Sequence, residues 1–250
     1  MDIQKIVLKD LTDFTGNDDE KQLSDIRNQL DSLRFKFLSN FTHISAEIYS
    51  PQLIPSLINL LKYKAGEYIN IKNKGLASQI RNNSKQCLEL IQRCGDIQEQ
   101  VQLCDSGLAI SLSVVIGIAG GSCIEEQFEV FNLLQLLNNF IYILKNGKQK
   151  DDYHEEYPNF ICKPEMTRTV EEQIEFEGGN EEVEALIYNK EGYYGNVKIY
   201  AKLTKETIQL IQCNYHMDII SISRNSSTDN IYNNIENNIE DNIEDESSTF

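Results

Sequence analysis

The sequence predicts an all-α protein, and three observations lead to that fold class. Apolar residues recur every three or four positions through most of the chain up to residue 213, which is the period of amphipathic helices. Four prolines and 13 glycines are few for an all-β protein that needs many tight turns. A hydrophobic content of 40% in 250 residues is enough to bury a core.

The first half of the chain predicts five helices. An apolar stripe beginning at Leu23 predicts the first helix, which continues toward Ile48 until Pro51 interrupts it. A loop rich in Lys, Gly and Asn is expected over residues 63–75, and Gly95 ends the helix that follows this loop. In order, these helices are expected at residues 23–48, 53–61, 80–94, 97–105 and 108–118.

The second half of the chain predicts a break and then longer helices. Residues 120–122 are Gly-Gly-Ser, which predicts the break, and residues 146–166 are polar with two prolines, which predicts a loop. The helices are expected at residues 125–146, 170–186 and 197–213. The first of these is apolar almost all round, as at the centre of a helical stack, and the second is broken at residues 178–179. A β-hairpin over residues 185–200 is the alternative, but the spacing after Val197 favours helices.

The net charge of −16 is concentrated in two segments. Residues 151–191 hold 13 acidic and three basic residues, and residues 224–250 hold seven acidic and one basic. The rest of the chain holds 19 of each and is neutral. Because phosphate recognition needs an excess of Lys and Arg, we expect no nucleic-acid partner.

No targeting or membrane segment is expected. The N-terminal residues lack the continuous apolar stretch of a secretory signal. The longest apolar run, residues 108–119, is well short of the ~20 residues that span a bilayer. The six cysteines stand singly, without a C-x-x-C pair, which favours free thiols in a reducing compartment. We therefore expect a cytoplasmic protein without membrane association, with the nucleus as the alternative compartment.

Catalytic residues, a metal site and a cofactor site are not expected. The three histidines, His43, His154 and His216, have no carboxylate or cysteine at metal-ligand spacing. Residues 117–122 are rich in glycine but lack the Lys-Ser/Thr of a phosphate-binding loop, so we interpret them as a helix break. The sequence therefore favours a non-enzymatic protein that uses no cofactor.

A recurring unit appears when the helices are aligned, since short apolar helices are each followed by a longer one. The short helices lie at residues 53–61, 107–115 and 179–187. The second and third follow an acidic residue and a glycine, Asp105 with Gly107 and Glu177 with Gly179. Over roughly residues 50–213 this pattern resembles the degenerate armadillo repeats of the armadillo/HEAT-like helical repeat superfamily.

The resemblance implies an armadillo-like, right-handed α-α superhelix with insertions. The starts of the units, Leu53, Leu108 and Asn180, are 55 and 72 residues apart, against about 40–47 in regular repeats. Insertions at residues 63–78 and 146–166 account for the excess. The expected organisation is an N-terminal segment (1–21), helical repeats with a capping helix (22–145), an acidic loop or linker (146–166), a final helical repeat (167–220) and a disordered acidic tail (221–250).

In armadillo proteins the longer helices line a groove that binds extended peptides, and the resemblance implies the same here. The ladder positions of such a groove correspond to Leu88 and Gln92 in one unit and to Leu134 and Asn138 in another. Nuclear-import adaptors use a Trp–Asn ladder at these positions, and since this chain has no Trp, cargo of that type is not expected.

The candidate peptide-binding residues are polar or basic side chains that share faces of the longer helices. They are Arg81, Lys85, Gln92, Gln135, Asn138, Asn139, Lys198, Lys202, Lys205 and Gln209. If they line the groove, it is polar and mildly basic, which suits an acidic peptide. The alternative is that they are ordinary solvated helix faces.

The chain ends in an acidic, low-complexity repeat with Ile at every fourth position from Ile231. Alone, this tail is expected to be disordered. One interpretation is a solubilising tail, and the other is an intramolecular ligand of the basic groove. The sequence thus predicts a protein–protein interaction module that binds an extended peptide or a partner surface. The alternatives are a regulatory or scaffold subunit whose helical stack is completed by a partner, and a small helical enzyme.

Overall fold

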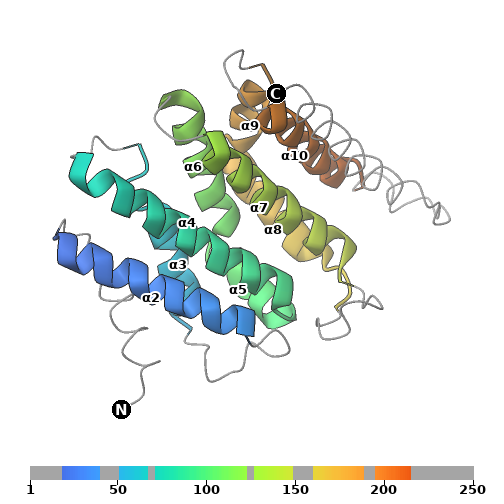
Figure 1. The fold of residues 1–250 in the computed structure, drawn as a ribbon. Coiled ribbons are helices and arrows are strands. Elements are labelled where there is room, and N and C mark those ends of the chain that lie inside the picture. The colour runs from blue at the N-terminus through green and yellow to red at the C-terminus, as the bar shows by residue number, and fades with distance from the viewer. Residues whose placement is uncertain are drawn as a thin grey trace, which may run out of the picture. The chain divides into compact units, whose positions relative to one another are not determined.

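Figure 1 shows the computed structural model of the chain, in which residues 19–39, 51–66, 71–122, 127–148, 160–188 and 195–214 are described. In these residues the structure has nine α-helices and, apart from one isolated bridge between Lys148 and Phe160, no β-structure. The all-α class is confirmed for this part of the chain. The helices are α2 (Glu20–Ser39), α3 (Leu53–Leu61), α4 (Ile71–Cys94), α5 (Ile97–Asp105), α6 (Leu108–Ser122), α7 (Gln127–Asn146), α8 (Pro164–Phe176), α9 (Gly179–Tyr188) and α10 (Gly195–Asn214).

The long helices α2, α4, α7 and α10 lie side by side in one layer (Figure 1). Helix α4 contacts α2 on one side and α7 on the other. Arg81 in the first half of α4 pairs with Glu129 near the start of α7, and Lys148, just after the end of α7, reaches the last carbonyls of α4. Helices α4 and α7 therefore run parallel.

The same parallel order relates α7 to α10. The rings of Phe131 and Tyr200 are 4.6 Å apart, and further along both helices Thr207 Oγ1 donates to Asn138 Oδ1 at 2.7 Å. Because the long helices run in one direction, the chain must return between them through the shorter helices.

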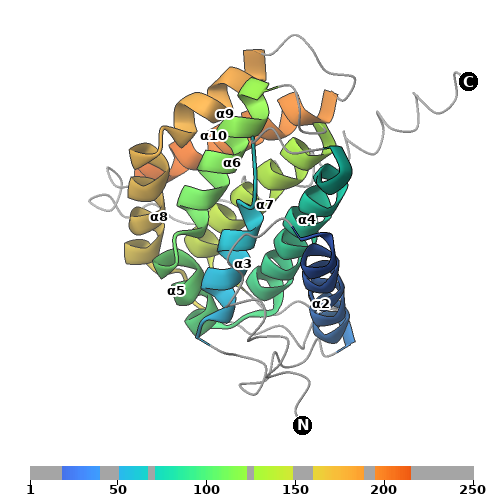
Figure 2. The ribbon, with the colours of Figure 1, turned by 90° about the vertical axis from the view of Figure 1, so that its left-hand side faces the viewer.

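The shorter helices α3, α6 and α9 form a second layer behind α4 and α7 (Figure 2). Helix α6 contacts both α3 and α9, and α5 contacts α8 at the edge of this layer. Apolar side chains from all nine described helices form one continuous core, in which Phe37 and Phe140 are the largest fully buried side chains. Each such burial stabilises the fold by about 1.5–3 kcal/mol.

Two matching turns connect the helices of the second layer. Gly107 ends the turn between α5 and α6 with φ +72°, and Gly178 ends the turn between α8 and α9 with φ +67°. In both turns the glycine N–H donates to the carbonyl three residues earlier, at 3.0 and 3.1 Å. Gln173 Nε2 of α8 also donates to the Cys104 carbonyl of α5 at 2.9 Å, which joins one turn to the other.

The C-terminal end of α4 is capped by a residue far away in the sequence. Lys148 Nζ donates to the carbonyls of Gln92, Arg93 and Gly95 at 2.5, 2.8 and 2.9 Å. A helix end leaves its last carbonyls without partners, and a cation there also offsets the helix dipole. Burial lowers the pKa of Lys148 to about 8, although the nearby Cys94, Glu99 and Asp96 act in the opposite direction.

Helix α5 begins next to this cap with a capping box. Asp96 Oδ1 accepts from Gln98 N at 2.7 Å, and Glu99 Oε2 accepts from Asp96 N at 2.6 Å. The two carboxyl groups also hydrogen-bond to each other. Burial, together with this hydrogen bond, raises the pKa of Glu99 to about 7, while the same hydrogen bond lowers the pKa of Asp96.

Two predictions about secondary structure were wrong. The loop expected over residues 63–75 ends earlier, since α4 already begins at Ile71. The break expected at residues 120–122 lies inside α6, where contacts with α3, α7, α8 and α9 outweigh the ~1 kcal/mol that each glycine costs a helix. The preference for helices over a hairpin is confirmed at residues 185–188 and 195–200, which are helical, while residues 189–194 lie outside the described residues. The extension of the first helix to Ile48 and the tail over residues 221–250 lie outside the described residues.

Among the described helices, none alone is both long and apolar enough to cross a membrane. Helix α5 and residues 108–118 of α6 pass the same test only as a pair, and this pair is bent by 54°.

Glycine replacements test the turn geometry. Gly107→Ala and Gly178→Ala each force a side chain into a left-handed backbone conformation and should lower the free energy of unfolding by about 1–2 kcal/mol. Gly75→Ala, inside α4 with open space where its Cβ would lie, should raise it by about 0.5–1 kcal/mol. Urea denaturation measures all three, and a neutral Gly107→Ala would contradict the assigned turn.

The capping box predicts a dependence of stability on pH. The pKa of Glu99 is about 7 in the folded chain and near 4.5 when unfolded, so between these values the folded state binds more protons. The free energy of unfolding should therefore fall as the pH rises from about 4.5 to 7. Glu99→Gln keeps an acceptor for Asp96 N and should flatten this slope, as measured by urea denaturation across the pH range. An unchanged slope in the variant would show that Glu99 is not the group responsible.

Candidate peptide-binding face

The exposed side of the long-helix layer is lined by side-chain amides. Ser84 Oγ of α4 donates to the Leu57 carbonyl of α3, so Ser84 marks the side of α4 that faces the second layer. At ~100° per residue, Asn82 and Gln86 lie about 160° away from Ser84, on the opposite side. On α7, Leu137 and Phe140 are buried, and the opposite side is polar.

We call this surface the amide face. It consists of five half-buried residues on two neighbouring helices: Asn82 and Gln86 of α4, and Asn132, Gln135 and Asn139 of α7.

Four of these five amides have no partner within the part of the chain that the structure describes. Gln86 Oε1 accepts from Arg34 Nη1 of α2 at 2.7 Å. The side chains of Asn82, Asn132, Gln135 and Asn139 make no hydrogen bond there. Neighbours three or four residues apart on one helix are about 5–6 Å apart, and packed helix axes are about 8–10 Å apart. The amides therefore form a grid of donors and acceptors open to a ligand.

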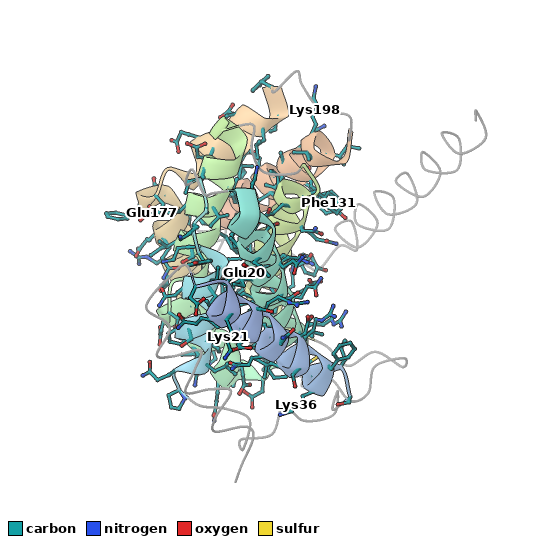
Figure 3. The ribbon with its side chains drawn as sticks, turned by 60° about the vertical axis from the view of Figure 1, so that its left-hand side comes forward. Glu20, Lys21, Lys36, Phe131, Glu177 and Lys198 are labelled. Atoms are coloured by element: carbon teal, nitrogen blue, oxygen red, sulfur yellow. The ribbon has the colours of Figure 1, made fainter. Side chains whose placement is uncertain are left out.

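An aromatic pair lies at one end of the amide face. Phe131 of α7 and Tyr200 of α10 meet edge to face, with an interplanar angle of 74°. Phe131 lies on one side of the structure and Glu177 on the other (Figure 3). Ile199, next to Tyr200, is exposed. This end of the face offers an apolar surface beside the polar grid.

The ten predicted site residues do not share one exposed surface in the structure. Gln135 and Asn139 lie on the amide face. Arg81, Lys85, Gln92 and Asn138 were expected on an exposed helix face and are buried instead. The physical reason is that α4 has neighbours on three sides, α2, α3 and α7, so only a narrow strip remains in contact with solvent. This strip is centred one residue further along α4, at Asn82 and Gln86 rather than Arg81 and Lys85.

The expected ladder positions are also inside the protein. Leu88, Gln92, Leu134 and Asn138 are all buried. Asn138 accepts the hydroxyl hydrogen bond from Thr207 and so holds α10 against α7. The four side chains therefore lie in the interior and not on a surface that a ligand could contact.

The predicted residues of α10 lie away from the amide face. Thr207 faces α7, and at ~100° per residue Lys198, Lys202 and Gln209 lie on the far side of α10, where they are exposed. Lys205 pairs with Glu184 of α9 at 2.7 Å. In Figure 3 Lys198 lies at one end of the structure and not beside Phe131.

The positive charge expected along the groove is balanced by carboxylates. Arg81 pairs with Glu129 at 2.9 Å, Lys202 with Glu206 at 3.9 Å and Lys205 with Glu184 at 2.7 Å. These contacts leave no excess of positive charge at the three bases. A diffusely basic surface, the reason for expecting an acidic peptide, is therefore not what these residues form.

At the seam between α4 and α7, the positive charge of one lysine is compensated less well than that of Arg81. Lys85 lies beside the buried pair of Arg81 and Glu129, and its ammonium is 3.7 Å from Glu89 Oε2. Its side chain is 8% exposed. Burial lowers the pKa of Lys85, and Glu89 opposes this effect only in part.

The described residues contain no obvious reactive centre. No three His, Cys, Asp or Glu side chains among them come together in a way that could hold a metal ion. Burial raises the pKa values of Cys87 and Cys104 to about 12, which makes both thiols poor nucleophiles. The chemistry available on the amide face is hydrogen bonding and apolar contact.

Sequence reasoning missed Asn82, Gln86 and Asn132. Asn82 and Gln86 stand next to Arg81 and Lys85, which looked equally exposed, and Asn132 stands between Phe131 and Leu133 in an apolar helix. Comparison with known protein families, curated proteins and solved structures gives no match for this chain.

Proposed function

We propose that the chain is a non-enzymatic protein-interaction module that binds an extended peptide segment across the amide face. The observation that carries this proposal is the set of four half-buried amides without partners in the described part of the chain. A side-chain amide offers two donors and one acceptor oxygen, which match the N–H and C=O groups of a peptide backbone. An extended peptide leaves those groups free, and a folded surface does not.

The spacing of the amides favours a peptide that crosses the long helices. An extended chain advances about 3.3 Å per residue, so three residues cover the ~10 Å between neighbouring helices. A peptide running along one helix would meet amides every ~5–6 Å, whereas its own groups on one side repeat every ~6.6 Å. Such a peptide would drift out of register within a few residues.

The armadillo-like architecture belongs to the same proposal. The matching turns at Gly107 and Gly178 support an internal repeat of three helices, α5–α6–α7 and α8–α9–α10. The parallel long helices and the returning short helices support a right-handed superhelix of such units. In that arrangement α2 takes the place of a long helix from a preceding unit, and α3 with α4 forms the unit between.

Alanine replacements on the amide face test the proposal. We expect a library of random neutral peptides of about 12 residues, selected on the purified chain, to yield binders. Asn82→Ala combined with Gln135→Ala should weaken those binders about 10–30-fold, since each lost hydrogen bond is worth about 1 kcal/mol. Fluorescence polarisation with a selected peptide measures the affinity.

The control is Asn59→Ala combined with Gln98→Ala, two exposed amides on α3 and α5. This pair should leave the affinity unchanged. The proposal fails if no peptide binds, or if the control pair weakens binding as much as the amide-face pair.

A further inference from the structure

The seam between α4 and α7 holds a lysine whose charge is poorly compensated. The side chain of Lys85 is 8% exposed, so its ammonium has lost most of its water. Its carboxylate partner Glu89 is 3.7 Å away, beyond the 2.7–2.9 Å of a charge-assisted hydrogen bond. An ammonium has three donors, and a charge taken out of water needs close partners.

A second pair in the same chain shows what is unusual about Lys85. Lys202 and Glu206 have the same four-residue spacing on α10 and a similar separation of 3.9 Å. Their side chains are 71% and 48% exposed, so water solvates both charges. Water therefore stabilises the ammonium of Lys202, whereas the ammonium of Lys85 is largely shielded from water and depends on a carboxylate 3.7 Å away.

The two carboxylates near Lys85, Glu89 and Glu129, compensate its charge only in part. Glu129 is already engaged by Arg81, whose Nε lies 2.9 Å from Glu129 Oε1. Glu89 lies on the same helix as Lys85, and its side chain is 37% exposed, so it can turn to solvent. At ~100° per residue Glu89 lies only about 20° from Asn82 around α4, so the place that Glu89 occupies is reached from the amide face.

We propose that Lys85 is the specificity-determining residue of the amide face and that it receives one carboxylate side chain of the bound peptide in place of Glu89. This inference rests on the proposed peptide binding. It names the partner as an extended peptide with a single Asp or Glu among neutral residues. A uniformly acidic segment does not fit, because Arg81, Lys202 and Lys205 are each paired with a carboxylate.

Two peptide libraries test the inference. Both consist of random peptides of about 12 residues without other charged residues, one with Glu fixed at the centre and one with Gln. The chain should prefer the Glu peptides by about 10-fold or more, since a hydrogen bond to a charged group is worth more than one to a neutral group. Fluorescence polarisation of matched Glu and Gln peptides gives the ratio of affinities.

Variants at the seam between α4 and α7 test whether Lys85 causes the preference for Glu peptides. Lys85→Met should lose the preference for Glu while still binding the Gln peptides. Glu89→Gln keeps the lysine and removes its internal competitor, so the preference should increase several-fold. This second variant also keeps the test decisive if Lys85→Met does not fold. The control, Lys202→Met combined with Glu206→Gln, should leave the preference unchanged.

The outcomes separate this inference from the proposed function. Equal affinity for Glu and Gln peptides, or a preference that survives in Lys85→Met, would overturn the role of Lys85 and leave peptide binding intact. A preference that does not increase in Glu89→Gln also counts against it. If neither library yields a binder, both proposals fail.

Discussion

The burial of α4 is the constraint on which the rest of the structure depends. This helix is packed against α2, α3, α5 and α7, and only one strip of it reaches solvent. Polar side chains outside that strip need partners inside the protein. Ser84 bonds to a carbonyl of α3, and Arg81 pairs with Glu129 of α7. Lys148, which follows α7 in the sequence, caps the C-terminal end of α4. Each of these contacts also fixes a neighbouring helix, so the polar residues of α4 determine how the two layers meet.

Much of the fold could be predicted from the sequence, because several helix ends carry local signals. Helices α3 and α5 have the predicted bounds, and α5 begins with a capping box at Asp96 and ends before Gly107. The failed break at residues 120–122 shows the limit of this reasoning, since tertiary contacts kept α6 helical against its local preference. The candidate site was harder to predict. Arg81 and Lys85 looked like a solvated face because the carboxylate that neutralises Arg81 lies 48 residues away.

One strongly acidic segment of the described chain lies away from the amide face. Eight glutamates fall between residues 165 and 184, on α8, α9 and the turn between them. Glu177 in this turn lies on the opposite side from Phe131 (Figure 3). The acidic segment therefore does not repel a ligand at the amide face through short-range contact, and at physiological salt its field decays over about 8 Å. The net charge of −16 and a neutral binding surface are compatible in one molecule.

The parallel layer of long helices has a consequence for how the chain folds. Most helices pack against elements close to them in sequence, as α3 packs on α4, α6 on α7 and α8 on α9. The contacting residues are separated by short stretches of chain, and such low contact order is associated with rapid folding. Stability is not uniform across a fold, so elements at its edges can open while the centre stays folded. Helix α2 has its main contact with α4 alone. Because the apolar side of α2 packs on α4, the departure of α2 would expose the buried side chains of both helices to water.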